Sequence, residues 1–385
     1  MPFTHNIRIK ATFANMGTKN ILYYIFSVVR VLLYPLALIY GAIVWLRNRL
    51  YDTKFFTSIE FSVPVITVGN LSTGGTGKTP HVEYLIRMLH YQYKVATMSR
   101  GYKRHTQGFI VADEHTNALR IGDEPMQYHM KFPELVVSVA EERMLGIPAL
   151  LQRKPEIEVI LLDDAYQHRS VRAGMNILIT DYSRPYYKDH ILPFGSLREG
   201  RSAAKRANII IVSKCPPDLS RDKAKEMVTA IKPLAHQQVF FTAINYGAPY
   251  DFFTREPGNI TDSHIILVCG IARPEPLVAM LKHNAADVHT LSYADHHYFV
   301  SSDLEEIKET WDKWDVPNKV IITTEKDAAR LHLHYGKLHD MGITIMVLPI
   351  NIYVLFGMES TLDATIQRYV EEVINDNKDP FGIEN

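Results

Sequence analysis

Residues 63–80 read VPVITVGNLSTGGTGKTP, and the rest of the chain is best understood from this stretch. The apolar run around Val65, Ile66 and Val68 predicts a buried strand, and residues 82–89 have the periodicity of an amphipathic helix. A strand, a glycine-rich turn, a Lys-Thr pair and a helix form the sequence context of a P-loop. Ser72 departs from the motif, because it stands where the first glycine is usual. The alternative is a glycine-rich turn that binds no phosphate.

This interpretation assigns a set of nucleotide-binding residues. Glycines let backbone N–H groups curl around a phosphate chain, and the following helix adds the positive end of its dipole. Lys78 is expected to contact the β- and γ-phosphates in catalysis, and the Thr79 hydroxyl is expected to bind Mg²⁺. The expected phosphate-binding residues are Gly74, Gly75, Thr76, Gly77, Lys78 and Thr79.

Two adjacent carboxylates, Asp163 and Asp164, follow the apolar run 159–162. A carboxylate at the end of a buried strand in a P-loop protein can hold the Mg²⁺ that the loop Thr also binds. Neighbouring strand residues point to opposite faces, so we expect one aspartate to bind the metal and the other to orient a neighbour. Which of the two is the ligand stays open, and an ordinary strand-end turn is the alternative.

Apolar runs that alternate with helical segments predict a doubly wound parallel sheet, in which ligands bind at the carboxyl ends of the strands. The aromatic-rich stretch 237–255 predicts a hairpin or an extended connector, with a second, smaller α/β domain beyond it. The expected organisation is a flexible N-terminus (1–20), a membrane-associated helix (21–50), a P-loop kinase domain (51–236), a connector (237–262), a C-terminal α/β domain (263–365) and a helix end and tail (366–385).

Composition narrows the class of protein. The 385 residues are 46% hydrophobic and 22% charged, and the formal net charge is zero. Without a basic block, nucleic acid is not an expected partner. The two cysteines, Cys215 and Cys269, imply no disulfide framework and fit a reducing cytoplasm. No obligate protein partner is evident.

Residues 21–46 form the most hydrophobic stretch of the chain. Arg30 leaves an uninterrupted apolar run of about 16 residues, which is short of the ~20 that span a bilayer. A helix half-sunk in the inner face of a membrane, with arginines and tyrosines at the headgroups, is the favoured interpretation. A buried core helix and a true span are the alternatives, and either Met1 or Met16 could be the start.

Two familiar P-loop classes are disfavoured. Switch GTPases read guanine with N-K-x-D, whereas the sequence here is Ser-Lys-Cys-Pro at 213–216. Partitioning-type ATPases carry a lysine before the Gly-Gly pair, and that residue here is Thr73. A membrane-associated P-loop GTPase or ATPase of the switch or metallocentre-assembly type stays as the alternative function, and nucleotide preference would discriminate it.

Seven motifs in order give the chain a specific resemblance over residues 20–350. They are GNLSTGGTGKTP (69–80), SRGY (99–102), GDEP (122–125), DDAYQH (163–168), LPFGSLRE (192–199), ADHHYF (294–299) and TEKDA (324–328). Together they resemble tetraacyldisaccharide 4′-kinase of lipid A biosynthesis. Ala165 and Tyr166 depart from the usual D-D-G-F-Q-H form, and neither supplies a metal ligand.

The resemblance implies an ATP- and Mg²⁺-dependent kinase at the cytoplasmic face of the inner membrane. Its acceptor would be the 4′-hydroxyl of a tetraacylated glucosamine disaccharide 1-phosphate. It suggests Asp123 as catalytic base, paired with His296, and a carboxylate that accepts the hydroxyl proton suits that chemistry. The alternatives are a helix cap for Asp123 and a surface or core histidine for His296.

The same motifs imply residues that bind the lipid substrate. Arg143 and Arg198 could clamp phosphate oxygens, and solvated helix arginines are the alternative. The full set of expected substrate-binding residues is Ser99, Tyr102, Glu124, Arg143, His168, Arg198 and Glu199.

Overall fold

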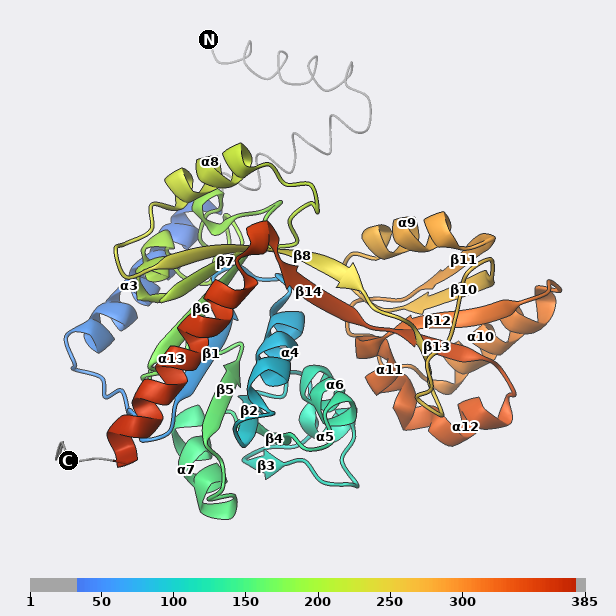
Figure 1. The fold of residues 1–385 in the computed structure, drawn as a ribbon, viewed down its shortest axis with the longest axis horizontal. Helices are drawn as coiled ribbons and strands as arrows, with labels where there is room; N and C mark the ends of the chain where they lie inside the picture. Colours follow the sequence, from blue (N-terminus) through green and yellow to red (C-terminus); the bar gives the residue numbers. More distant parts are fainter. Residues whose placement is uncertain (1–32, 379–385) are drawn as a thin grey trace, which may run out of the picture.

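The computed structural model describes residues 33–378, which form two β-sheets with helices packed around them (Figure 1). The larger sheet has nine strands, in the order β14-β8-β7-β6-β1-β5-β2-β4-β3. In that order their bounds are β14 (Ile350–Val354), β8 (Gln238–Tyr246), β7 (Ile209–Ser213), β6 (Met175–Asp181), β1 (Val65–Asn70), β5 (Val159–Asp163), β2 (Val95–Ser99), β4 (Val136–Val139) and β3 (Ile110–Val111).

The predicted parallel sheet is confirmed, with antiparallel strands at its two edges. All neighbours from β8 to β4 pair in parallel, whereas β14 and β3 run antiparallel to β8 and β4. The central strands are buried along their length, as expected when helices cover both faces of a sheet.

Alternate side chains of the strands pack on helices of opposite faces. On one face Ile66 and Ile177 pack with α4, α6 and α13, and on the other Leu162 and Ile210 pack with α7 and α8. The helices around this sheet are α4 (Lys78–Leu89), α5 (Ala118–Ile121), α6 (Asp123–Lys131), α7 (Arg143–Arg153), α8 (Arg221–Ile231) and α13 (Glu359–Lys378).

The second sheet has five strands, in the order β11-β10-β12-β13-β9. Their bounds are β11 (Asp287–Ser292), β10 (His264–Cys269), β12 (Lys319–Thr324), β13 (Ile345–Leu348) and β9 (Tyr250–Asp251), and the helices beside them are α9 (Glu275–Asn284), α10 (Ser301–Lys313), α11 (Glu325–Leu331) and α12 (Tyr335–Asp340). Neighbouring strands are parallel except for the edge strand β9.

The link between the two sheets differs from the expected connector over 237–262. Residues 238–246 form β8, which belongs to the nine-stranded sheet and pairs with both β7 and β14. The expected hairpin around Gly247 is absent from the described residues, because β9 pairs with β13 rather than with β8. The expected C-terminal domain also ends earlier than residue 365: β14 joins the larger sheet, and Leu362, Ile366 and Val370 of α13 lie in its core.

A helix of 19 residues, α3 (Tyr34–Asp52), precedes the larger sheet. Its polar side is bonded to two loops. In the loop after β6, the Arg198 carbonyl accepts from the Tyr40 hydroxyl at 3.0 Å and Glu199 accepts from Asn48 at 2.7 Å. In the loop after β5, the Gln167 carbonyl accepts from Arg47 at 2.9 Å. Large apolar side chains of the helix are exposed, namely Tyr34, Leu36, Leu38, Ile39, Ile43, Trp45 and Leu46.

No helix within residues 33–378 is long and apolar enough to cross a membrane. The expected flexible N-terminus (1–20), the first part of the expected membrane helix (21–32) and the end of the tail (379–385) lie outside the described residues.

Candidate active site

The P-loop connects β1 to α4 at the carboxyl end of the sheet. Gly74 and Gly77 have φ angles of 99° and 88°, a backbone region that glycine adopts without strain. A Cβ on Gly74 would meet no atom within 4 Å, so conformation rather than space requires glycine there. Gly77 caps α4 without a side-chain hydrogen bond, and Gly74 and Gly75 face solvent. The first N–H groups of α4 are therefore suited to an anion.

Lys78 lies among oxygen atoms at the start of α4. Its Nζ is 3.5 Å from Asp164 Oδ1 and 3.4 Å from Asn70 Oδ1. Arg198 approaches the same carboxylate, with Nη2 2.8 Å from Asp164 Oδ1 and Nη1 3.2 Å from Oδ2. Partial desolvation opposes the charge of Asp164, but Lys78 and Arg198 hold its pKa far below the ordinary value.

Asp163 is buried at the end of β5, and its two oxygens differ. Oδ2 accepts a hydrogen bond of 3.0 Å from the Tyr128 hydroxyl, whereas Oδ1 has no hydrogen-bond partner among the described residues. Burial raises the pKa of Asp163 to about 6 although the charge of Lys78 opposes that shift. An unpaired, desolvated carboxylate oxygen beside a phosphate-binding loop suits Mg²⁺, which prefers oxygen ligands.

A second cluster joins α6 to the five-stranded sheet. Asp123 is fully buried at the start of α6, and its Oδ2 lies 2.8 Å from Nδ1 of His296, which follows β11. Arg330 of α11 donates to the same oxygen from Nε at 2.9 Å. Burial opposes the charge of Asp123, but the hydrogen bond from His296 and the charge of Arg330 hold its pKa below the ordinary value.

His296 also has a defined partner on its other nitrogen. Lys326 Nζ lies 3.2 Å from Nε2 of His296 and 2.8 Å from Glu124 Oε1. Because an ammonium can only donate, a neutral ring with its proton on Nδ1 satisfies both contacts of His296. Its backbone has a φ of 59°, which is uncommon for a residue other than glycine.

Sequence reasoning missed three residues of this region: Tyr128, Lys326 and Arg330. Lys326 stands inside TEKDA, so the motif itself held the signal. Arg330 is three residues after Asp327, to which it is also paired at 2.8 Å, and this i,i+3 spacing on a helix was a second signal. The pairing of Tyr128 with Asp163 had no signal in the local sequence.

The other expected substrate-binding residues include a buried Arg143–His168 pair and an exposed tyrosine, Tyr102. Arg143 is buried, with Nη1 3.1 Å from His168 Nε2 and Nη2 3.3 Å from the Asp163 carbonyl. Burial, followed by the charge of Arg143, lowers the pKa of His168 to about 4. Tyr102 is exposed and packs edge-on against His296, with ring centroids 5.3 Å apart.

Ser99 and Glu199 are more enclosed. Ser99 is buried at the end of β2, and its hydroxyl accepts from the Gly101 amide at 3.3 Å. Glu199 is buried and accepts from Arg206 at 3.0 Å and from Asn48 of α3 at 2.7 Å. The carboxylate of Glu199 is thus engaged in holding α3 and the loop after β6 together.

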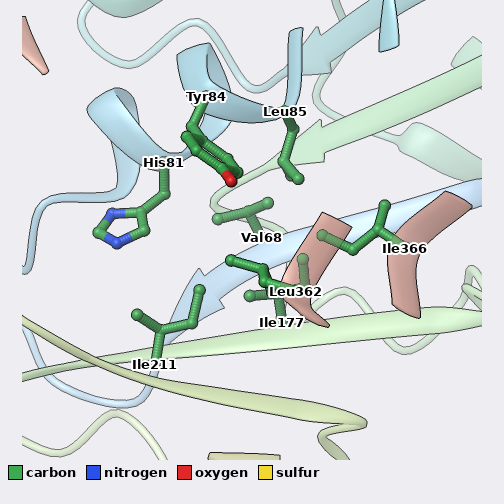
Figure 2. Close-up of a pocket in the computed structure, with 8 residues that line it drawn as sticks. All are labelled: Val68, His81, Tyr84, Leu85, Ile177, Ile211, Leu362 and Ile366. Atoms are coloured by element: carbon green, nitrogen blue, oxygen red, sulfur yellow. The ribbon is translucent and has the colours of Figure 1, made fainter. Parts of the chain in front are cut away.

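Behind the P-loop, His81 fixes the first turns of α4 to β8. Its Nδ1 is 2.7 Å from the Gly77 carbonyl and its Nε2 is 3.0 Å from Thr242 Oγ1. Since a carbonyl only accepts, the proton is on Nδ1, and Thr242 donates to Nε2. Beneath this histidine lies a small apolar pocket (Figure 2), lined by Val68, His81, Tyr84, Leu85, Ile177, Ile211, Leu362 and Ile366.

A parallel α/β sheet, a glycine-rich loop between β1 and α4, and an aspartate pair at the end of β5 define a P-loop protein. Residues 29–371 match the family described as tetraacyldisaccharide-1-P 4′-kinase. The chain belongs to this family, as the resemblance predicted.

Individual relatives agree with this assignment. The tetraacyldisaccharide 4′-kinase of Bacteroides thetaiotaomicron is 43% identical over 353 residues, covering 88% of this chain and 93% of the relative. That of Flavobacterium johnsoniae is 43% identical over 350 residues, covering 90% and 98%. The crystal structure of LpxK from Aquifex aeolicus in complex with ATP has a TM-score of 0.69 and 26% identity, covering 89% of this chain and 99% of that one.

Proposed function

We propose that this chain transfers the γ-phosphate of ATP to the 4′-hydroxyl of a tetraacylated glucosamine disaccharide 1-phosphate. Family membership supports the activity, and one observation carries the mechanism. The buried Asp123 is hydrogen-bonded to His296 at 2.8 Å, in a chain that also carries a P-loop with a Lys-Thr pair. A P-loop GTPase switch needs no such carboxylate for a sugar hydroxyl, so the pair favours the kinase over that alternative.

The nucleotide would bind through the loop from Gly74 to Thr79. Backbone N–H groups at the start of α4 and the ammonium of Lys78 would hold the phosphates. Thr79 and Asp163 would hold Mg²⁺, which neutralises charge on the transferred phosphoryl group when bound. Asp163 is favoured over Asp164 because one of its oxygens has no partner within residues 33–378, while both oxygens of Asp164 contact Arg198.

Asp123 would act as the general base. Its lowered pKa keeps it ionised at neutral pH, so it can accept the proton of the attacking hydroxyl. Its Oδ1 has no hydrogen-bond partner among the described residues, and we assign the proton to that atom. His296 and Arg330 hold Oδ2 and thereby orient the carboxylate.

The acceptor would lie between the two clusters. Tyr102 packs on the His296 ring from the solvent side, and Ser99 precedes it at the end of β2. Arg143, His168 and Arg198 gather around the aspartate pair, where guanidinium groups suit phosphate oxygens. Glu124 and Glu199 would act through Lys326 and Arg206 rather than on the lipid itself.

We further propose that α3 lies in the inner surface of the cytoplasmic membrane. Its polar side is bonded to the loops beside the aspartate pair, and its opposite side exposes leucine, isoleucine and tryptophan. An exposed apolar patch of this kind, with Arg47 and Arg49 at its end, suits a peripheral helix. The P-loop part and the smaller part around the second sheet would then face the lipid acceptor together.

The decisive experiment measures transfer of labelled γ-phosphate from ATP to a tetraacyl disaccharide 1-phosphate in detergent. We expect a 4′-phosphorylated product that requires Mg²⁺, and little product with GTP as donor. Asp123→Asn serves as the control for background transfer. GTP-specific hydrolysis without a lipid product would contradict the proposal.

A further inference from the structure

Helix α6 is the element that carries Asp123, and contacts hold it at both ends. At its start, His296 and Arg330 bind the Asp123 carboxylate. At its end, the carbonyl of Met130 accepts a hydrogen bond of 2.7 Å from Arg255, which follows β9. Residues beside the second sheet therefore contact α6 at both ends, although α6 itself packs in the core of the larger sheet.

Lys131, the last residue of α6, joins three helices. Its Nζ lies 2.7 Å from Glu83 Oε2 on α4 and 2.6 Å from Glu325 Oε1 on α11. Helix α4 begins at the P-loop lysine, and α11 carries Lys326 and Arg330. A single ammonium thus links the nucleotide-binding helix, the base-carrying helix and the helix that orients the base.

The partners of Lys131 are fixed by further bonds. Glu83 is fully buried and accepts from Gln127 of α6 at 2.7 Å, with Arg87 of its own helix at 3.6 Å. The other oxygen of Glu325 accepts from the backbone N–H of Ile350 at 3.2 Å, where β14 begins. The bridge therefore also touches the strand that returns from the second sheet to the first.

Burial makes this bridge sensitive to loss of its cation. Glu83 and Glu325 have side chains that are almost completely enclosed, and Lys131 is mostly enclosed. Removing one partner of a buried ion pair leaves an uncompensated charge, which is far more costly than the pair itself is stabilising. Burial, together with the nearby charge of Glu83, raises the pKa of Glu325 to about 7.

We propose that Lys131 is a positioning residue that sets the place of Asp123 relative to the P-loop, by fixing α6 between α4 and α11. This inference rests on the proposed role of Asp123 as the base. In-line transfer needs the base, the hydroxyl and the γ-phosphate in one arrangement, and a shift of about 1 Å can cost on the order of 10²-fold in rate. Lys131 touches neither reacting atom, so its effect passes through the three helices.

The test compares Lys131→Met, Lys131→Arg and the charge-balanced double variant Lys131→Met/Glu325→Gln. We expect Lys131→Met to lower kcat for the lipid acceptor by about 10-fold or more, with the KM for ATP within about 2-fold of wild type. Lys131→Arg should keep most of the rate. Lys223→Met, which removes an exposed ion pair with Glu226 on α8, is the matched control and should be neutral.

The double variant separates positioning from stability. It leaves no unpaired charge, so its thermal midpoint should return close to wild type, while kcat should stay low because the bridge is absent. Recovery of kcat together with the thermal midpoint would overturn the proposal, since Lys131 would then act only on stability.

A distance measurement tests the role of Lys131 without an activity assay. Spin labels at Tyr91→Cys, just after α4, and at Lys313→Cys, the last residue of α10, are both exposed and report the spacing between the end of α4 and the helix beside the second sheet. Burial raises the pKa of Cys215 to about 12 and of Cys269 to about 11, which keeps the native thiols unlabelled. We expect a broader distance distribution in the double variant than in the wild type. Equal distributions would overturn the proposal even if the wild type phosphorylated no lipid.

Discussion

Lys78 shows how the P-loop lysine is placed before any phosphate binds. It is held between Asn70 and Asp164 rather than extended into solvent. A phosphate chain in the loop would compete with Asp164 for the ammonium, and Arg198 would keep the aspartate paired. If Lys78 acts on the transferred phosphate as we propose, its side chain is already positioned for transition-state charge, which would lower the reorganisation needed for catalysis.

We therefore expect Lys78→Ala to lower kcat by at least ~10²-fold, the size of effect seen when a single preorganised donor is removed. Steady-state transfer of labelled phosphate at saturating lipid and varied ATP would measure it. Lys225→Ala, at an exposed position on α8, is the control. Unchanged turnover in Lys78→Ala would remove the P-loop from the mechanism.

We predict that substitutions of Asp123 and His296 have non-additive effects on kcat. Asp123→Asn should lose about 10²- to 10⁴-fold in kcat, because no other carboxylate in the described part of the chain takes its place beside His296 to accept the proton. His296→Ala should lose less, since Arg330 still holds the carboxylate. The double variant should be much less impaired than the product of the single losses. Steady-state rates at saturating ATP measure all three, and multiplicative losses would mean independent roles.

His81 gives a pH prediction. Burial lowers its pKa to about 4, below the unfolded value of 6.5, so the folded protein binds fewer protons than the unfolded chain between these values. Its contribution to stability is complete above pH 6.5 and is lost as the pH falls toward 4. The stability already lost at pH 5 is about 2 kcal/mol. The difference in unfolding free energy between pH 7 and pH 5, measured in urea, should therefore be smaller for His81→Gln. An equal pH dependence would contradict the assignment of a neutral ring.

At the scale of elements, α3 combines two different surfaces on one helix. Tyr40 and Asn48 bond to Arg198 and Glu199 in the loop after β6, and Arg47 donates to the Gln167 carbonyl in the loop after β5, so the helix is part of the folded body. Its exposed residues Leu36, Ile39 and Ile43 occupy successive turns on one side. A helix that is both docked and apolar outside brings the loops after β5 and β6 close to whatever surface it binds.

We expect Ile39→Gln/Ile43→Gln to reduce binding to phospholipid vesicles, because it removes apolar contact without touching the docked side. Co-sedimentation with vesicles would measure this, and Leu145→Gln, exposed on α7, is the control. Activity on acceptor in vesicles should fall more than activity on acceptor in detergent. Equal loss in both would argue against docking through α3.

How far the sequence predicted the structure differs between elements. Apolar runs such as 159–162 and 209–212 identified buried strands, because a strand that is covered on both faces is apolar at every position instead of alternating with polar residues. The P-loop and the aspartates followed from local spacing. The pairing of β8 with β14 could not be predicted in this way, since it joins residues about a hundred positions apart.

The candidate site shows the same limit. Asp123 and His296 were expected together from a family resemblance, and the structure brings them to 2.8 Å. The pairings of Arg330 with Asp123, Lys131 with Glu325 and Tyr128 with Asp163 could not be predicted, because a buried contact between distant elements depends on tertiary packing rather than on neighbouring residues. Periodicity assigns a residue to a face, but it does not name the partner on another element.

For the whole molecule, the site depends on both sheets. The P-loop and the aspartate pair belong to the larger sheet, whereas His296, Lys326 and Arg330 come from the elements of the smaller one (Figure 1). Within residues 33–378, only the paired strands β8 and β14 carry the backbone between them. The placement of Asp123 relative to the P-loop therefore depends on contacts across the two parts, such as Arg330 with Asp123 and Lys131 with Glu325.

The backbone leaves the larger sheet at the end of β8 and returns to it at the start of β14. The two strands are antiparallel neighbours, and Tyr246 lies opposite Ile350. Residues 247–349 are therefore an insertion between two strands that pair like the arms of a hairpin. A two-residue Asn-Gly turn would close that gap, because adjacent antiparallel strands need no longer connection. The shortened chain would keep the P-loop and α13 but lose His296 and Arg330, which hold the Asp123 carboxylate. Such a deletion should yield a protein that binds nucleotide but transfers no phosphate to the lipid.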